Sequence, residues 1–393
     1  MTCLPRAGFA ALTAALLACG TAAPPARAQL LLSANDNKIT LENGALKVLR
    51  EPQPDTLSIL DLSVSPPALR AEIPVPASAI GPPSSVAVTP NEKLALVTAN
   101  QRPDPAEPGK LLPGNTMAVI DLTATPPRIA ATLPTGSAPA GVSINRAGTL
   151  ALVANRAEGS VSVYRIAGGQ VTPAGKVDIG PVGSEVSDVA FTPDGRFALV
   201  TRYGDHMLNL LQIEGDKVTK LDREITAGVR PYGVTVAPDG RWAAVANIGR
   251  GTGDADTVSL IDLTREPFRV VDTISVGQTP EGIAASPDGR HLAVTVMNGS
   301  NKRPGSPFHG PGLVRMLRVE NGRMALVSKA QVGAWAQGAA FSPDGRMLFV
   351  GNMLDKDLSA FRVAEDGQLT EAGPRIKIAG ASAALAVASR PPR

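Results

Sequence analysis

Short apolar runs separated by one recurring turn organise most of this chain. The pattern is clearest around Pro238-Asp239-Gly240-Arg241, which lies between the runs 233–237 and 242–246. Proline presets the backbone angle of the second turn position, and glycine adopts the left-handed conformation that lets the chain re-enter a strand. The Val- and Ala-rich runs on both sides therefore predict two strands joined by a tight hairpin turn.

The same unit recurs along the chain and extends to four strands. The turn returns at 193–196, 287–290 and 343–346, with weaker copies at 90–93 and 146–149. A third run with strict two-residue alternation follows, for example at 160–164 and 257–263, and then a weaker fourth run, as at 270–274. A period of about 45 to 56 residues with four strands per unit is typical of a β-propeller blade.

The two ends of the chain together predict one further blade. Six complete units begin near Ser84, Pro139, Val186, Pro231, Pro280 and Ala336. The N-terminal part supplies runs at 30–34, 56–62 and 71–73 but no first strand, whereas residues 383–388 supply a first strand alone. Joining them closes the ring and removes exposed strand edges. We therefore expect an all-β fold: a single seven-bladed β-propeller of four-stranded antiparallel blades over residues 29–393.

Residues 1–28 have the pattern of a signal peptide. Arg6 precedes an apolar run, and Ala26-Arg27-Ala28 resembles a cleavage signal, which predicts cleavage after Ala28. The alternative is a lipoprotein signal with an acylated Cys19. Both interpretations predict export, to a periplasm or outside the cell. The apolar run is too short to span a membrane.

The composition excludes several classes of function for the exported domain. Cys3 and Cys19 both lie in the targeting segment, so residues 29–393 offer no thiolate nucleophile, disulfide or Cys-bound metal. Loss of Arg6 and Arg27 lowers the basic residues from 38 to 36 against 35 acidic ones, leaving a net charge of about +1. We therefore expect no nucleic-acid partner, no cofactor and a monomer.

The repeat resembles a known family. From Pro231 to Leu263, the pattern Pro-x-Gly-Val-x-Val-x-Pro-Asp-Gly-Arg, then Ala-Val-Ala-Asn, then Thr-Val-Ser-Leu-Ile-Asp-Leu is similar to the YVTN β-propeller repeat. This resemblance implies the wider lactonase-like group of seven-bladed propellers, which includes gluconolactone hydrolases, amine-dehydrogenase heavy chains and surface-layer proteins. The group shares a fold rather than a reaction. No stretch of the chain matches a lactonase active site residue by residue.

The connections between second and third strands are the long ones. Such loops occur at 99–115, 247–256 and 298–312, and residues 36–55 include an expected extra hairpin of 38–41 with 45–48. In a meander these connections share one face of the ring, and repeat proteins often carry binding loops on one face. This face is the expected binding face. The alternative is that loop length varies here without a functional reason.

The starts of the inner strands should surround the channel mouth on that face. We hypothesise that a polar site for a small or peptide-like ligand forms there from Arg202, Tyr203, Arg230, Tyr232, Glu281, Trp335 and Gln337. Arg202 stands where other units have Asn155, Asn247 and Asn352, which we expect to cap the following turn or to adopt a left-handed backbone. The alternative is that the ring of side chains binds only water and itself.

No catalytic residues follow from the sequence. His291 is expected on a solvated strand, and neither His206 nor His309 has an evident metal partner, so no metal site is predicted. A proton-transferring pair of Glu281 with Asp188 or His206 is conceivable. Residues 249–256 precede a strand rather than a helix, which favours a flexible loop over a phosphate or Ca²⁺ site.

Three functions remain open. The first is an exported binding or interaction module that presents a ligand or partner site on the long loops. The second is a lactonase-type hydrolase acting at the channel mouth. The third is a non-catalytic subunit of a periplasmic redox enzyme.

Overall fold

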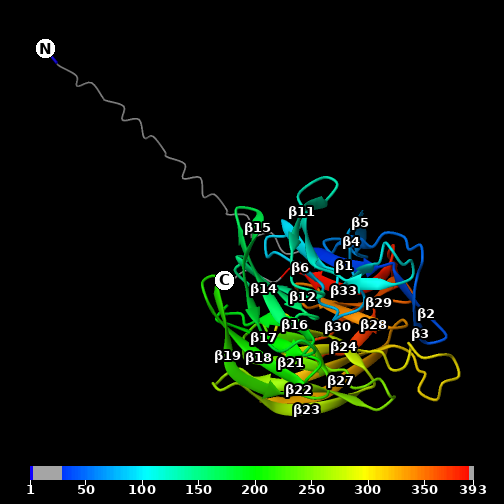
Figure 1. Cartoon of the computed structure of the whole chain (residues 1–393). Helices are drawn as coiled ribbons and strands as arrows, with labels where there is room; N and C mark the ends of the chain where they lie inside the picture. The colour runs from blue at the N-terminus through cyan, green and yellow to red at the C-terminus, as the bar shows by residue number, and fades with distance from the viewer. Residues whose placement is uncertain (3–28, 389–393) are drawn as a thin grey trace.

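Seven antiparallel blades surround a central channel in the computed structural model, which describes residues 1–2 and 29–388 (Figure 1). The predicted seven-bladed fold is confirmed. Apart from its first two residues, the predicted signal peptide lies outside the described residues. Within residues 1–2 and 29–388, no helix is long and apolar enough to cross a membrane.

We number the blades in chain order and give their strands from the channel outward. The first three blades are β33 (Ala381–Val387), β1 (Leu30–Asp36), β4 (Thr56–Asp61) and β5 (Ala68–Pro74); β6 (Val86–Val88), β7 (Leu94–Thr98), β10 (Thr116–Asp121) and β11 (Arg128–Pro134); and β12 (Pro139–Ile144), β13 (Leu150–Asn155), β14 (Ser160–Ala167) and β15 (Gln170–Asp178). Blades 4 and 5 are β16 (Val186–Phe191), β17 (Phe197–Arg202), β18 (Met207–Glu214) and β19 (Lys217–Thr226), then β20 (Pro231–Val236), β21 (Trp242–Asn247), β22 (Asp256–Asp262) and β23 (Arg269–Gly277). Blades 6 and 7 are β24 (Pro280–Ala285), β25 (His291–Val296), β26 (Leu313–Glu320) and β27 (Arg323–Gln331), then β28 (Ala336–Phe341), β29 (Met347–Asn352), β30 (Asp357–Val363) and an outer edge split into β31 (Leu369–Glu371) and β32 (Ile376–Lys377).

The hydrophobic core lies between adjacent blades. For example, Leu32 and Ile59 of blade 1 pack in one buried cluster with Val97 and Ile120 of blade 2. The apolar side chains on both faces of each sheet are thus buried only when the blades stack, as the repeat pattern predicts.

The inner strands approach one another too closely for ordinary side chains at one position. Glycine occupies this position in four blades, at Gly141, Gly233, Gly282 and Gly338. A Cβ atom at Gly282 would lie 1.9 Å from the carbonyl oxygen of Gln337 in the next blade. Blade 4 departs from this rule and carries Asp188.

The C-terminal strand completes blade 1, as predicted. Strand β33 pairs with β1 in antiparallel register, with Leu31 opposite Val387 and Ala34 opposite Ala384. The predicted extra hairpin is also present, as β2 (Ile39–Glu42) and β3 (Ala45–Val48). A second hairpin, of β8 (Gln101–Pro103) and β9 (Leu111–Pro113), forms inside the long loop of blade 2.

The four long connections touch one another and form a crown on one face, at the right in Figure 1. A Cβ atom on Gly44 of the extra hairpin would lie 2.6 Å from the Arg303 nitrogen of the blade 6 loop. Lys302 donates to the Gly251 carbonyl of the blade 5 loop, and Gly109 of blade 2 lies against Arg50. The crown therefore comes from blades 1, 2, 5 and 6 and leaves short connections over blades 3, 4 and 7.

The repeated asparagines have a different role from the predicted one. Their oxygens accept a hydrogen bond from the glycine of the preceding blade crossing, as Asn155 does from Gly136 and Asn247 from Gly228. Their amide nitrogens donate to hydroxyl groups of the third strand, such as Ser162. They hold strands two and three to the crossing and do not adopt a left-handed backbone.

His291 also differs from the prediction, because its side chain is buried and not solvated. It is 4% exposed, and a Cβ atom on Gly367 of blade 7 would lie 2.8 Å from its ring. Burial lowers the pKa of the His291 imidazole. The sequence suggested solvation because the residue follows an exposed turn, but the outer loop of the next blade covers it.

Ring closure makes the last strand necessary for stability. Leu385 is 6% exposed and packs in the cluster between blades 7 and 1. We expect Leu385→Ala to lower the free energy of unfolding by about 2 to 5 kcal/mol, measured by urea denaturation. The matched control is Leu46→Ala on the exposed β2–β3 hairpin, which should change stability by less than about 0.5 kcal/mol. Equal effects of the two substitutions would contradict this role for the closing strand.

Candidate functional site

The crossings into the inner strands place a repeated set of residues at the channel mouth. Glu185, Arg230 and Trp335, each directly before an inner strand, have left-handed backbones with φ of 49°, 57° and 53°. Non-glycine residues rarely adopt this conformation, and it persists where surrounding bonds hold it. Here each carbonyl accepts a hydrogen bond from the residue that follows the second strand, such as Tyr203 to Glu185 at 3.1 Å.

This backbone pairing gathers cationic and aromatic side chains from blades 3, 4 and 5. The Arg156 guanidinium lies 4.4 Å from the centre of the Tyr203 ring and 5.7 Å from that of Tyr232. Arg230 lies 5.0 Å from the Tyr203 ring, and the two tyrosine rings are 5.6 Å apart. Arg156 pairs with Glu185 at 3.2 Å, whereas Arg230 has no ion pair among the residues that the structure describes. Within the described part of the chain, the positive charge of Arg230 is therefore not balanced by an ion pair.

A second group, from blades 6 and 7, contains buried polar atoms without hydrogen-bond partners. These atoms are Glu281 Oε2, Trp335 Nε1 and Gln337 Oε1. Glu281 and Gln337 are 5% and 1% exposed. Burial raises the pKa of Glu281 to about 8, and the nearby Gln337, Trp335 and Arg156 side chains offset this only in part. The Glu281 carboxyl is thus mostly protonated at neutral pH.

Arg156 and Tyr232 connect the two groups. The Arg156 charge lowers the pKa of Glu281, and the Glu281 charge contributes to the raised pKa of Tyr232, whose main cause is burial. We call the combined set the mouth cluster: Arg156, Tyr203, Arg230, Tyr232, Glu281, Trp335 and Gln337. It has six of the seven residues hypothesised from the sequence. Whether these residues bind a ligand stays a prediction.

Arg202 lies apart from the mouth cluster. Its guanidinium contacts Asp205 and Glu224 and donates to Asn209 at 2.9 Å, all within blade 4. Arg202 and Asn209 occupy the places of Asn155 and Ser162 in blade 3. Blade 4 therefore replaces the Asn–Ser pair of blade 3 with an Arg–Asn pair at the same two positions.

Sequence reasoning missed Arg156. A signal was present, because Arg156 follows the second strand of blade 3 at the position that Tyr203 has in blade 4. Extending the alignment of repeats by one residue past the asparagine would have found it. Its contact with Tyr232 depends on the left-handed crossings, which the repeat pattern does not show.

A large cavity lies on the other face, inside the channel. It has a volume of about 600 Å³ and extends from the Pro-Asp-Gly turns to Ser84 and Asp188. The carboxylate of Asp188 accepts hydrogen bonds from Ser84 Oγ at 2.7 Å and from the Val234 and Val189 amides at 2.9 Å. These contacts join blades 2, 4 and 5 across the axis, so Ser84 and Asp188 form the floor of the cavity.

The other suggested chemistry does not assemble around Glu281. Asp188 is engaged at the channel floor, and His206 Nδ1 accepts the Arg230 backbone amide at 3.1 Å. Among the described residues, no three His, Cys, Asp or Glu side chains are grouped to hold a metal ion. In the 249–256 loop, Asp256 accepts the Thr279 amide, and Phe308 of the crown packs against Gly253.

Comparisons with known proteins place the fold but no activity. No family model matches the chain, and no curated protein does. Solved structures with a similar fold include a putative 6-phosphogluconolactonase from Bacteroides fragilis, at 16% identity and a TM-score of 0.68, covering 92% of this chain and 98% of that one. A periplasmic gluconolactonase from Pseudomonas aeruginosa has 17% identity and a TM-score of 0.64, covering 92% and 99%. Hydrazine synthase from Kuenenia stuttgartiensis has 17% identity and a TM-score of 0.60, covering 81% and 92%.

These likenesses show the fold alone: a β-propeller shared with solved structures of a putative 6-phosphogluconolactonase and a gluconolactonase. The resemblance inferred from the repeats is thereby confirmed at the level of the fold. At this low identity, the comparison assigns no site residue and no reaction.

The raised pKa of Glu281 predicts a pH dependence of stability. A carboxyl whose pKa is higher in the folded state stabilises the fold fully below its unfolded pKa, and this contribution is lost as the pH rises through the folded pKa. The free energy of unfolding should therefore fall between about pH 5 and about pH 9, and Asp188, with a pKa raised to about 7, adds a loss of the same sign.

Urea denaturation across this range tests the prediction. Glu281→Gln removes the titration and should make the decline clearly shallower, whereas Glu320→Gln on an exposed strand end should leave it unchanged. A decline of the same size in Glu281→Gln would show that Glu281 is not the source.

Proposed function

We propose that this protein is an exported ligand-binding propeller whose mouth cluster binds a small, oxygen-rich anion of the sugar-acid type. The observation that supports this most directly is the set of buried polar atoms of Glu281, Trp335 and Gln337 that, among the described residues, have no hydrogen-bond partner outside this group. Buried polar atoms without partners are costly, and a ligand that pairs them recovers that cost.

Charge favours an anion. At neutral pH the Arg156–Glu185 pair is balanced and Glu281 is mostly protonated, so Arg230 gives the mouth cluster a net positive charge. Its guanidinium can bind a carboxylate in a bidentate manner. The rings of Tyr203, Tyr232 and Trp335 offer flat surfaces against which a sugar ring can pack. The crown has no long connection over blades 3, 4 and 7.

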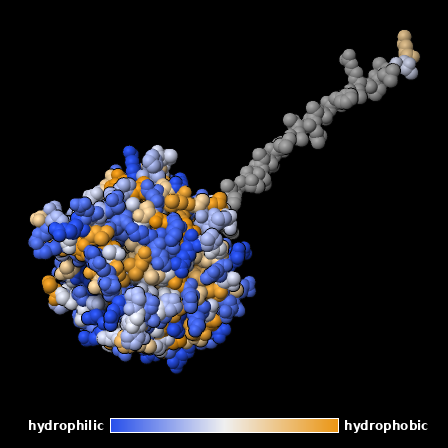
Figure 2. Space-filling view, turned by 90° about the vertical axis from the view of Figure 1, so that its right-hand side faces the viewer, coloured by the Kyte–Doolittle hydropathy of each residue, from blue (hydrophilic) through white to orange (hydrophobic). Residues whose placement is uncertain are grey.

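The alternative for a binding module is that it binds another protein and not a small molecule. Figure 2 shows the crown face, on which hydrophilic side chains are interspersed with smaller hydrophobic areas and no single apolar area dominates. Large contiguous apolar patches are typical of protein docking sites. The buried polar mouth therefore favours the small-molecule form over this one.

Calorimetric titration with D-gluconate tests the proposal. We expect binding that weakens by at least about tenfold in Arg230→Gln, because one charge-assisted hydrogen-bonding group is lost. Arg318→Gln on an exposed outer strand is the matched control and should bind like the unmodified protein. Absence of gluconate binding, or equal affinities in both variants, would reject a sugar-acid site here.

A second candidate function is lactone hydrolysis, favoured by the gluconolactonases among the similar folds. Ionised Glu281 would accept a proton from a water molecule that attacks the lactone carbonyl, and Arg156 would stabilise the oxyanion. The ring C–O bond then breaks and its oxygen takes up a proton, giving the hydroxy acid. The pKa of about 8 places this base within reach of physiological pH.

Acid release from D-glucono-1,5-lactone, corrected for the uncatalysed reaction, distinguishes the two candidates. An enzyme should show activity that rises with pH through about 8 and a loss of at least about hundredfold in Glu281→Gln. Gluconate binding without lactone turnover supports the binding module alone. Turnover that survives Glu281→Gln would exclude the hydrolytic role of Glu281.

A further inference from the structure

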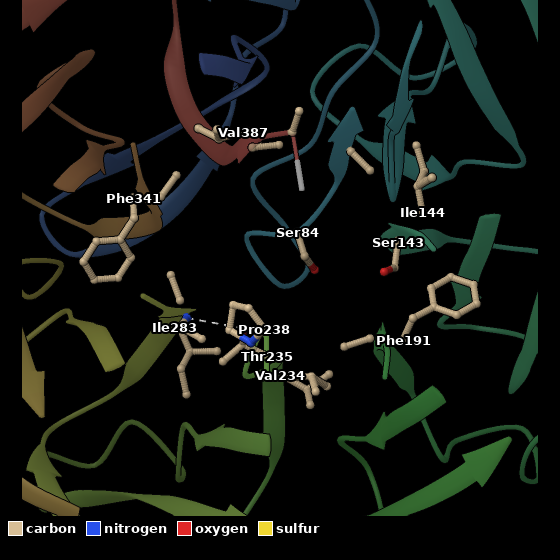
Figure 3. A pocket seen from close by; sticks show the side chains of 18 of the residues that line it. Ser84, Ser143, Ile144, Phe191, Val234, Thr235, Pro238, Ile283, Phe341 and Val387 are labelled. Carbon is tan, nitrogen blue, oxygen red and sulfur yellow. Dashed lines mark hydrogen bonds between the residues drawn. The ribbon is translucent and has the colours of Figure 1, made fainter. Parts of the chain in front are cut away.

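The channel pocket on the turn face is a separate, largely apolar chamber. Figure 3 looks into it: Ile144, Phe191, Val234, Ile283 and Phe341 surround the space, and Ser84 reaches its centre from the blade 1–2 crossing. A volume of about 600 Å³ lies within the range of about 300 to 1,000 Å³ typical of small-molecule sites. The chamber is thus large enough for a ligand of several carbon atoms.

The floor separates this chamber from the mouth cluster. The blade 1–2 crossing, residues 75–85, passes over the axis on the mouth side. Its Ala79 carbonyl accepts a hydrogen bond from Gln337 of blade 7, and Ser84 donates to Asp188 of blade 4. A ligand entering from the turn face therefore meets Asp188 before it can meet any residue of the mouth cluster.

The charged groups that line the chamber are mostly acidic. They are Asp188 at the floor and Asp239, Asp288 and Arg146 near the turns. Arg146 reaches from blade 3 toward the Pro238 carbonyl of blade 5, so it lies at the entrance. The floor itself has Asp188 as its one charged lining residue, 2% exposed and facing walls of Val, Ile and Phe.

We propose that this chamber is a second binding site, for a small organic cation with an apolar body, with its ammonium group at Asp188. An ionised carboxylate has about four acceptor positions, and three hydrogen bonds from Ser84, Val189 and Val234 leave one for the ligand. The apolar body then lies between the inner strands, where its transfer from water is favourable.

Charge and position both argue for a cation. A carboxylate ligand at the floor would face the buried carboxyl of Asp188, and like charges repel strongly where water is excluded. An alcohol would gain the apolar contacts but not the charge-assisted hydrogen bond, which is roughly twice as strong as a neutral one. Asp188 also replaces the glycine or small residue that other blades have here, so its carboxyl is an addition to the ring rather than a part of the repeat.

Calorimetric titration of the full chain with n-hexylammonium chloride, 1-hexanol and sodium hexanoate tests this proposal at about pH 8, where the ammonium group is charged. We expect the ammonium ion to bind at least about tenfold more tightly than the alcohol, and hexanoate to bind more weakly than either. Equal binding of amine and alcohol, or no binding of the amine, would overturn the proposal.

Two variants locate the site. Ser143→Phe fills the chamber from a residue whose hydroxyl points into it in Figure 3 and should abolish amine binding. Asp188→Asn should remove the preference for amine over alcohol. An Asn side chain at 188 cannot accept all three hydrogen bonds, so thermal unfolding checks that the Asp188→Asn variant still folds. If this variant does not fold, the result for Ser143→Phe alone decides whether the site is in the chamber.

The control variant is Arg230→Gln. Arg230 lies on the other side of the floor, so this substitution should leave amine binding unchanged. Amine binding that survives Ser143→Phe would place it elsewhere and reject the channel site. Gluconate binding should depend on Arg230, whereas amine binding should depend on Ser143 and Asp188. The two proposals can therefore fail independently, and the titrations show which one fails.

Discussion

The close approach of the inner strands at the axis is the constraint on which the rest of this structure depends. At Gly282 and Gly233 a Cβ atom would lie 1.9 Å and 2.7 Å from the carbonyl oxygen of the neighbouring blade. A side chain larger than hydrogen is therefore excluded there unless it can point into the channel. Larger side chains stand one residue nearer the strand start, as Tyr232 and Glu281 do. The left-handed crossings then bring the residue after the second strand beside them.

The same close approach of the inner strands explains why Asp188 contacts several blades at once. It occupies the crowded position in blade 4, and its carboxyl lies where the Cβ of Gly141 would otherwise be, at 2.2 Å. Blade 3 tolerates this because it has glycine at that point. The carboxyl then accepts hydrogen bonds from Ser84 and Val234 across the axis and forms the floor of the turn-face cavity.

The blade count, the closing strand and the extra hairpin could be predicted because each depends on local patterns: the Pro-Asp-Gly turns, the two-residue alternation and Glu42-Asn43-Gly44. Six residues of the mouth cluster could be found because repeats align. Arg202 lies apart from the cluster because the change at its repeat position is matched by Asn209 on the next strand, and the burial of His291 was missed because Gly367 of another blade covers it. The channel floor could not be predicted, since it needs the path of residues 75–85 across the axis.

Buried ionisable groups in this protein have two different forms, one fully paired and one not. Lys38 is 2% exposed, yet it is held by Asp55 at 2.7 Å and Asp36 at 3.2 Å, and Asp36 in turn accepts the Lys38 and Ala79 amides. This group is fully paired and fixes the β2–β3 hairpin to blade 1, as a structural ion cluster should. Glu281 is also buried, but its Oε2 atom, the Trp335 indole nitrogen and the Gln337 amide oxygen have no hydrogen-bond partner outside their own group in the described part of the chain. Blades 3 and 4 have Ala140 and Ser187 at the equivalent position, so the repeat does not require an ionisable side chain there, and this supports the proposed ligand site.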